Sequence, residues 1–172
     1  LHRRELKLDA VAVSLGPGSY TGLRIGLSQS KGLCFGLDIP LIGVDSLQAL
    51  AVKAMFMPRD WQGDELLIPM VDARRMEVYT AAYNFALNPV MEPQPLILSA
   101  DSYKNLPEGQ RAFYFGSGAA KAQEMLTRPG TEYLKVSPLI ASDLIALAEK
   151  AYREQRFLDV AYSTPLYLKA VH

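Results

Sequence analysis

"SLGPGSYTGLRIG", residues 14–26, holds four glycines and a proline between two apolar runs. The run before it, residues 9–15, is rich in alanine and valine and predicts a buried strand. The run after it predicts a helix that extends to about Leu37, with Thr21 as its N-cap. A strand, a glycine loop and a helix in this order form a general anion site, because the first N–H groups of a helix lack partners and carry the positive end of its dipole.

Two known phosphate-binding patterns do not fit this loop. The GxxxxGK[ST] pattern fails because no Lys-Ser or Lys-Thr pair follows at the required distance. The dinucleotide pattern GxGxxG fails by one place, since its third glycine position is occupied by Thr21. A turn with no ligand is therefore at least as well supported as an anion or nucleotide loop. Such a loop would comprise Gly16, Gly18, Ser19, Thr21 and Gly22. Tyr20 beside it could then stack on a base.

Small residues recur at four-residue spacing in the predicted helix, first at Gly22, Gly26 and Ser30, then at Gly32 and Gly36. Each glycine inside a helix costs about 1 kcal/mol against alanine, so several together need a reason. Small residues allow another backbone to approach closely. That neighbour is either a helix of the same chain, which the residues alone slightly favour, or a helix of a partner.

The rest of the chain predicts an α/β protein of two parts, residues 1–57 and residues 58–172, divided at the polar stretch 58–65. We expect a strand over 40–44 and a helix that starts at Asp45 or Ser46. A hairpin over 66–85 turns at Arg74-Arg75 without the usual glycine. Further expected elements are strands at 94–99, 111–118 and 133–138, helices at 119–127 and 142–157 (with Ser142 as N-cap), and a docked extended tail from 163.

Composition excludes several functions. The chain of 172 residues has a formal net charge of zero, which gives no case for a dedicated nucleic-acid binder but leaves a local basic patch open. The histidines are His2 and His172, and the single cysteine is Cys34, so we expect no metal site, no catalytic triad and a reducing, cytoplasmic location. No apolar run approaches the ~20 residues that cross a bilayer. We assign no catalytic residue.

Charged residues gather at the predicted hairpin, where "VDARRMEVY" contains Asp72, Arg74, Arg75 and Glu77. They could bind an anion or a partner surface. A solvated turn with local ion pairs is the favoured interpretation, because most exposed charge clusters of this kind are only solvated.

Three segments, residues 12–51, 71–83 and 162–169, resemble the TsaB (formerly YeaZ) family over nearly the whole chain and in the same order. The resemblance implies a two-lobed actin-like, sugar-kinase-like (ASKHA) fold. It also implies a non-catalytic subunit of the bacterial complex that makes N6-threonylcarbamoyladenosine at tRNA position 37. The implied partners are TsaD and the ATPase TsaE, and the chain would contact tRNA only indirectly, through the complex. The resemblance implies no membrane partner and no cofactor in this chain, with ATP and metal bound by the partner subunits. The interface helix would present Gly22, Leu23, Gly26, Ser30 and Leu33.

The family pattern begins with a β-hairpin, a third strand and a long helix that precede the strand at Asp9, and here we expect the first lobe to be incomplete at its N-terminus. Two other functions stay open. One is an actin-like nucleotide-binding phosphotransferase that uses the glycine loop, with Asp9, Asp38 and Asp45 as the early acidic candidates for positioning a metal. The other is a homodimeric binding module that uses the glycine face of the helix.

Overall fold

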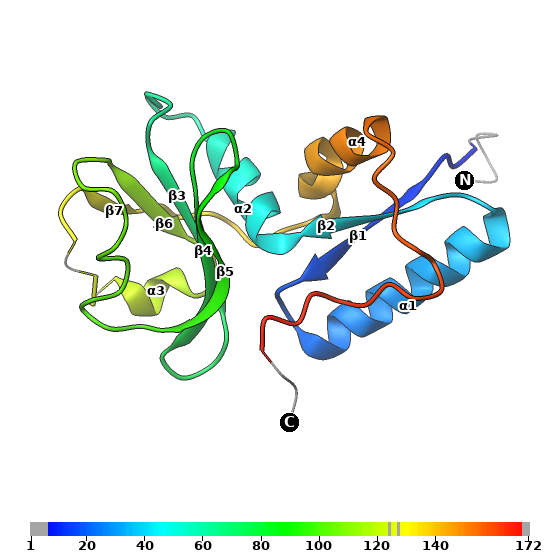
Figure 1. Cartoon of the computed structure of the whole chain (residues 1–172), viewed down its shortest axis with the longest axis horizontal. Helices are drawn as coiled ribbons and strands as arrows, with labels where there is room; N and C mark the ends of the chain where they lie inside the picture. Colours follow the sequence, from blue (N-terminus) through cyan, green and yellow to red (C-terminus); the bar gives the residue numbers. More distant parts are fainter. Residues whose placement is uncertain (1–6, 124, 127, 170–172) are drawn as a thin grey trace.

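The computed structural model describes residues 7–123, 125–126 and 128–169. His2 and His172 lie outside these residues. The chain forms a two-stranded parallel sheet, β1-β2, and a five-stranded sheet in the order β5-β4-β3-β6-β7. The two sheets lie side by side in the long direction of the molecule (Figure 1). No described helix is long and apolar enough to cross a membrane.

The first sheet is a β-α-β unit. Strand β1 (Val11–Gly16) pairs in parallel with β2 (Leu41–Asp45), and the crossover between them is helix α1 (Tyr20–Leu37). Thr21 was the expected N-cap, and this is wrong: the hydroxyl of Ser19 accepts the Gly22 N–H at 3.3 Å, so α1 begins two residues earlier. The helix ends at Asp38, which adopts a left-handed conformation and donates its N–H to the Cys34 carbonyl.

Helix α2 (Ser46–Met55) connects the two sheets. Of the two expected caps, Asp45 is the one used, since its carboxylate accepts the N–H groups of Leu47 and Gln48 at 2.7 and 2.9 Å. The buried face of α2 packs on the second sheet in one apolar cluster, which includes Leu47, Leu50, Ala51, Ala54, Leu67, Phe113 and Phe115. The predicted boundary at residue 58 falls just after this helix.

The second sheet is built on the expected hairpin, which is confirmed: β3 (Leu66–Asp72) and β4 (Glu77–Tyr83) pair antiparallel. Strand β5 (Pro89–Ile97) is antiparallel to β4, while β6 (Ala112–Phe115) is parallel to β3 and β7 (Thr131–Tyr133) is parallel to β6. Two expected lengths are wrong. Helix α3 (Ala119–Ala122) has a single turn, and the strand expected at 133–138 instead lies at 131–133.

The C-terminal helix is shorter than the expected span 142–157, which is wrong at both ends. A 3-10 turn, η1 (Ala141–Leu144), precedes α4 (Ile145–Arg153), and Ser142 does not cap it. The carboxylate of Asp143 instead accepts the Ile140 N–H at 2.8 Å and bonds the Lys53 ammonium at 2.7 Å.

Sequence order also misplaces α4, which was grouped with the second part of the chain. It packs on the first sheet, where Ala151 joins Ile42, Val44 and Ala49 in one buried cluster. The chain then continues along the same sheet, with a bridge between Leu158 and Leu41. We call β1, β2, α1, α4 and the chain after it the first lobe, and the five-stranded sheet with α3 the second lobe. The expected docking of the tail is confirmed by the Leu166 N–H, which donates to the Leu15 carbonyl at 2.8 Å.

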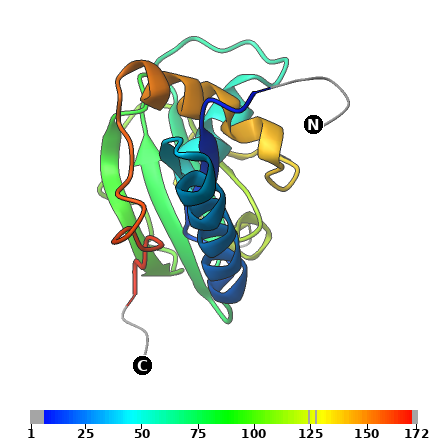
Figure 2. The same ribbon diagram turned by 90° about the vertical axis from the view of Figure 1, so that its right-hand side faces the viewer.

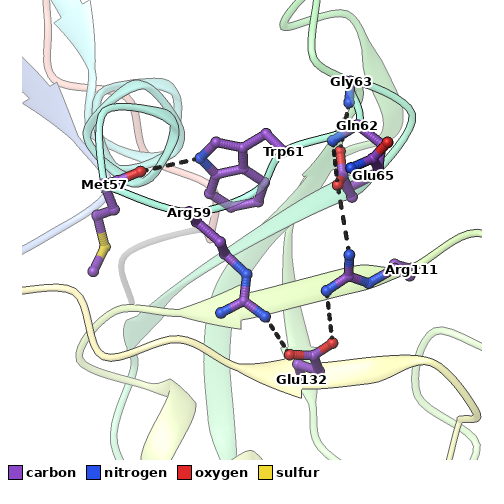
Figure 3. Close-up of polar contacts among 8 residues, drawn as sticks. All are labelled: Met57, Arg59, Trp61, Gln62, Gly63, Glu65, Arg111 and Glu132. Carbon is purple, nitrogen blue, oxygen red and sulfur yellow. Dashed lines mark hydrogen bonds and ion pairs between the residues drawn. The ribbon is translucent and has the colours of Figure 1, made fainter.

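The segment between α2 and β3 is held by a fully buried carboxylate (Figure 3). Glu65 accepts the backbone N–H groups of Gln62 and Gly63, both at 2.8 Å, and a guanidinium nitrogen of Arg111 lies 4.0 Å away. Burial alone would raise the pKa of Glu65, but the two backbone N–H groups and Arg111 together hold it below its usual range. The carboxylate therefore stays ionised and fixes this loop.

A second carboxylate extends the same network to β7. The carboxylate of Glu132 accepts a hydrogen bond from the Arg111 guanidinium at 3.0 Å and a second one from the Arg59 guanidinium. The Arg59 guanidinium also lies 4.3 Å from the centre of the Phe113 ring. The hydrogen bond from Arg111 lowers the pKa of Glu132. Trp61 donates its indole N–H to the Met57 carbonyl at 3.2 Å, which joins the end of α2 to the same loop. The carboxylates of Glu65 and Glu132 thus both have hydrogen-bond or charge partners within the fold.

Candidate functional site

The glycine loop turns the chain sharply at the carboxyl end of β1. Gly16 has a φ of 102°, and a Cβ built there would lie 2.7 Å from the Leu23 side chain, so only glycine fits. The N–H of Gly22 is committed to Ser19 and does not face a ligand. The remaining predicted loop residues, Gly18, Ser19 and Thr21, line an open cleft.

This cleft lies between the two lobes. It has a volume of about 670 Å³, with Ser19, Tyr20 and Thr21 on the wall formed by the first lobe. The β3–β4 turn supplies Asp72 and Arg74 to the opposite wall. The loop and the hairpin, which are about fifty residues apart in the sequence, therefore share one site. Sequence reasoning found both features and did not connect them.

The acidic groups of the cleft are neutralised by lysines from other elements. Lys121 of α3 donates to the Asp72 carboxylate at 2.8 Å and to the carbonyls of Arg75 and Glu77 at 2.7 and 2.8 Å. The hydrogen bond from Lys121 lowers the pKa of Asp72. Lys169 in the tail binds both carboxylate oxygens of Glu77 at 3.0 Å. The expected local ion pairs within the turn are wrong, because the cationic partners of Asp72 and Glu77 are Lys121 of α3 and Lys169 of the tail.

The turn carries backbone strain. Arg74 and Arg75 have φ angles of 71° and 47°, and the turn is closed by a hydrogen bond from the Arg74 N–H to the Asp72 carboxylate at 2.6 Å. The Ala73 N–H donates to the Glu77 carbonyl and the Glu77 N–H to the Arg74 carbonyl, both at 3.1 Å, so the connection comprises residues 74–76. A residue with a Cβ pays roughly 1–2 kcal/mol at a positive φ, and Gly, Asn or Asp usually occupies such positions. Two consecutive arginines are therefore retained here against the local conformational preference.

The predicted interface residues do not share one face of α1. Gly22 and Leu33 are exposed, whereas Ser30 is buried and a Cβ built on Gly26 would lie 3.8 Å from Val13 of β1. Leu23 lies close to Gly16 on the same inner side. Residues four apart on a helix drift by about 40° per step, so the series from Gly22 through Gly26 to Ser30 crosses from the exposed side of α1 to its inner side.

The outward face of α1 is apolar and lies in front of the molecule in Figure 2, with no other described element over it. Phe35, Ile25 and Leu33 are 84%, 54% and 51% exposed. A Cβ built on Gly32 or Gly36 would have no atom within 4 Å. The four-residue spacing of these two glycines was visible in the sequence, but it did not show which face points outward.

The residues that the phosphotransferase hypothesis needs do not meet in the cleft. Asp45 caps α2, Asp38 ends α1, and Asp9 precedes the opposite end of β1. Within residues 7–123, 125–126 and 128–169, no three His, Cys, Asp or Glu side chains are grouped so that they could hold a metal ion. Cys34 is buried, which raises the pKa of its thiol.

Comparison with known proteins agrees with this architecture. A family model described as TsaD, tRNA N6-adenosine threonylcarbamoyltransferase, matches residues 4–164. The chain belongs to the TsaD family, in its TsaB (YeaZ) branch. Its relatives include "tRNA threonylcarbamoyladenosine biosynthesis protein TsaB" of Bacillus subtilis, 39% identical over 63% of this chain and 45% of that protein. The protein of the same name in Escherichia coli is 27% identical over 94% of this chain and 71% of that protein.

Solved structures show the same fold. YeaZ from Pseudomonas aeruginosa has a TM-score of 0.77 and 28% identity, over 94% of this chain and 74% of that one. The actin-like fold implied by the resemblance is confirmed. On this actin-like fold, the candidate sites of the chain are the cleft between the lobes and the outer face of α1.

Proposed function

We propose that this chain is a non-catalytic subunit of the bacterial complex that makes N6-threonylcarbamoyladenosine in tRNA, and that it binds TsaD through the outward face of α1. TsaE, ATP and metal belong to the rest of a cytoplasmic complex. The names of the relatives support the pathway. The observation that carries the binding role is the outward face itself, with Phe35 84% exposed beside two glycines where an added Cβ would meet no atom of the described residues within 4 Å.

This face suits a partner helix. Gly32 and Gly36 would let a second helix approach closely, and Ile25, Leu33 and Phe35 would supply apolar contact around that approach. Small-to-small contact with an apolar border is typical of packing between helices. A second copy of this chain fits the same description, so a homodimer is the second candidate in the absence of TsaD.

Gly32→Leu tests the proposal. The side chain enters open space, so the chain itself should fold normally, but a partner helix would be held away. We expect association with TsaD to weaken by tenfold or more, which corresponds to about 1.4 kcal/mol. Light scattering of the mixture and a dissociation constant measure it.

The matched control is Ala146→Leu, which also places a leucine side chain at an exposed position of a helix, here α4. It should leave the association with TsaD unchanged. A folded Gly32→Leu chain that binds TsaD as the natural chain does would remove the interface. A chain that stays a homodimer when TsaD is added would favour the second candidate.

A further inference from the structure

Basic side chains surround the mouth of the cleft in excess of acidic ones. Lys121 and Lys169 are matched by Asp72 and Glu77. Arg24, Arg74 and Arg75 make no ion pair within the described part of the chain. The whole chain has no net charge, so this is a local concentration of positive charge. It fits an anionic partner.

The unmatched arginines lie on the two lobes. Arg74 lines the cleft and Arg75 follows it in the β3–β4 turn, whereas Arg24 of α1 contacts Tyr20, which lines the wall of the first lobe. Positive charge spread across both sides of a cleft suits the successive phosphates of a nucleic-acid strand more than one compact anion. The strained turn points the same way, since arginines occupy two positive-φ positions that Gly or Asn would adopt with less strain.

An aromatic platform lies between these charges. The Tyr20 ring is 42% exposed, its centre is 5.6 Å from that of Tyr167, and the Arg24 guanidinium lies 5.0 Å from the ring centre. Arg24 also donates to the Tyr20 hydroxyl at 2.7 Å, which fixes the ring. Exposed aromatic rings beside arginine stack unpaired bases in single-stranded RNA.

We propose that the mouth of this cleft binds a single-stranded segment of RNA, with Arg74 and Arg75 on its phosphates and Tyr20 under a base. This rests on the proposed function for the source of the RNA, a tRNA loop, and goes beyond it by giving this chain direct contact with RNA. A double-stranded stem presents paired bases that Tyr20 cannot reach, so the contact selects a loop.

The decisive variant is Arg74→Asn/Arg75→Gly, which places residues that tolerate a positive φ at both positions while it removes both charges. Its thermal midpoint should equal or exceed that of the natural chain. The probe is a fluorescein-labelled, unmodified anticodon stem-loop, added to the complex with TsaD and followed by anisotropy at several salt concentrations. We expect binding to weaken by about tenfold or more and the salt slope to fall by about 1.4, the value for two phosphate contacts on a single strand.

Two controls accompany it. Arg153→Gln/Arg156→Gln removes two charges, one from the last residue of α4 and one from the chain just after it; neither residue lines the cleft, so RNA binding should stay unchanged. Tyr20→Phe should retain binding, and Tyr20→Ala should lose about tenfold or more, because only the ring stacks.

Unchanged RNA affinity in Arg74→Asn/Arg75→Gly would overturn the proposal. So would displacement of the RNA by ATP alone at matched affinity, which would assign the cleft to a free nucleotide. Light scattering reports TsaD association separately. If the natural chain does not join TsaD, the proposed function fails, and the same RNA titration on this chain alone still decides the RNA contact.

Discussion

At the scale of single residues, two glycines have opposite effects on stability. Gly116 has a φ of 103°, and a Cβ there would collide with the backbone carbonyl of Met70 in the neighbouring strand. Gly32 is helical and meets nothing. Structure needs the first glycine, whereas the second lowers the stability of α1 and is retained only if something outside the chain uses the space.

We therefore expect opposite effects from two alanine substitutions. Gly32→Ala should stabilise the chain by about 1 kcal/mol, because alanine is the better helix former. Gly116→Ala should destabilise it by about 2 kcal/mol or more, since it adds both backbone strain and a clash. Urea denaturation measures both free energies of unfolding. A destabilised Gly32→Ala chain would show that α1 is packed differently from the structure described here.

At the scale of elements, α1 and the loop after α2 each have two sides or two ends with different surroundings. The inner side of α1 covers β1 and its outer side is apolar but open. The loop 58–65 joins the lobes and is fixed by one buried carboxylate, Glu65, which no polar pattern in the sequence singled out. Its signal was only the second of two adjacent acids, Asp64 and Glu65, before an apolar strand, which is too common to interpret.

Glu65→Gln should destabilise the chain by about 1–3 kcal/mol at neutral pH, because the new amide NH2 faces a backbone N–H and leaves it unpaired. The difference should depend on pH. The folded pKa of Glu65 is lowered, so its contribution is complete above the unfolded value of about 4.3 and disappears as the pH falls through the folded value. Urea denaturation of both chains between pH 7 and pH 3 measures it. An unfolding difference that stays constant over that range would contradict this role.

At the scale of the whole molecule, the tail links the two lobes. Leu166 bonds β1, Leu168 packs on the cluster that includes α2 and β6, and Lys169 reaches Glu77 on β4. Tyr167 contacts Tyr20 at the cleft. The tail thus contributes to the lining of the same cleft as the glycine loop, although the two segments are far apart in the sequence.

Removing residues 163–172 should lower the thermal midpoint and speed amide hydrogen exchange in β1 and around Glu77, while the centre of the second sheet remains protected. Exchange followed by mass spectrometry checks this, and removal of residues 170–172 alone serves as the matched control. Equal protection of β1 in both truncated chains would mean that the tail does not connect the lobes.

Local pattern determined part of this protein. The run before Gly16, the caps at Asp45 and near Ser19, and the alternation around Arg74-Arg75 carry their own structure, because backbone sterics and nearest-neighbour hydrogen bonds act within a few residues. The resemblance to the TsaB family depended on the same loop and hairpin. These features were therefore predictable to within one or two residues.

Only the tertiary structure decided which surfaces matter. The periodicity of α1 showed that the helix has faces, but the contact with Val13 chose the inner one and left Phe35 outside. Sequence order grouped α4 with the second lobe, whereas its apolar side found β2. The cleft exists because Tyr20, Arg74 and Lys169 meet across long stretches of chain. Such contacts depend on how whole elements pack, and no short window of sequence contains that information.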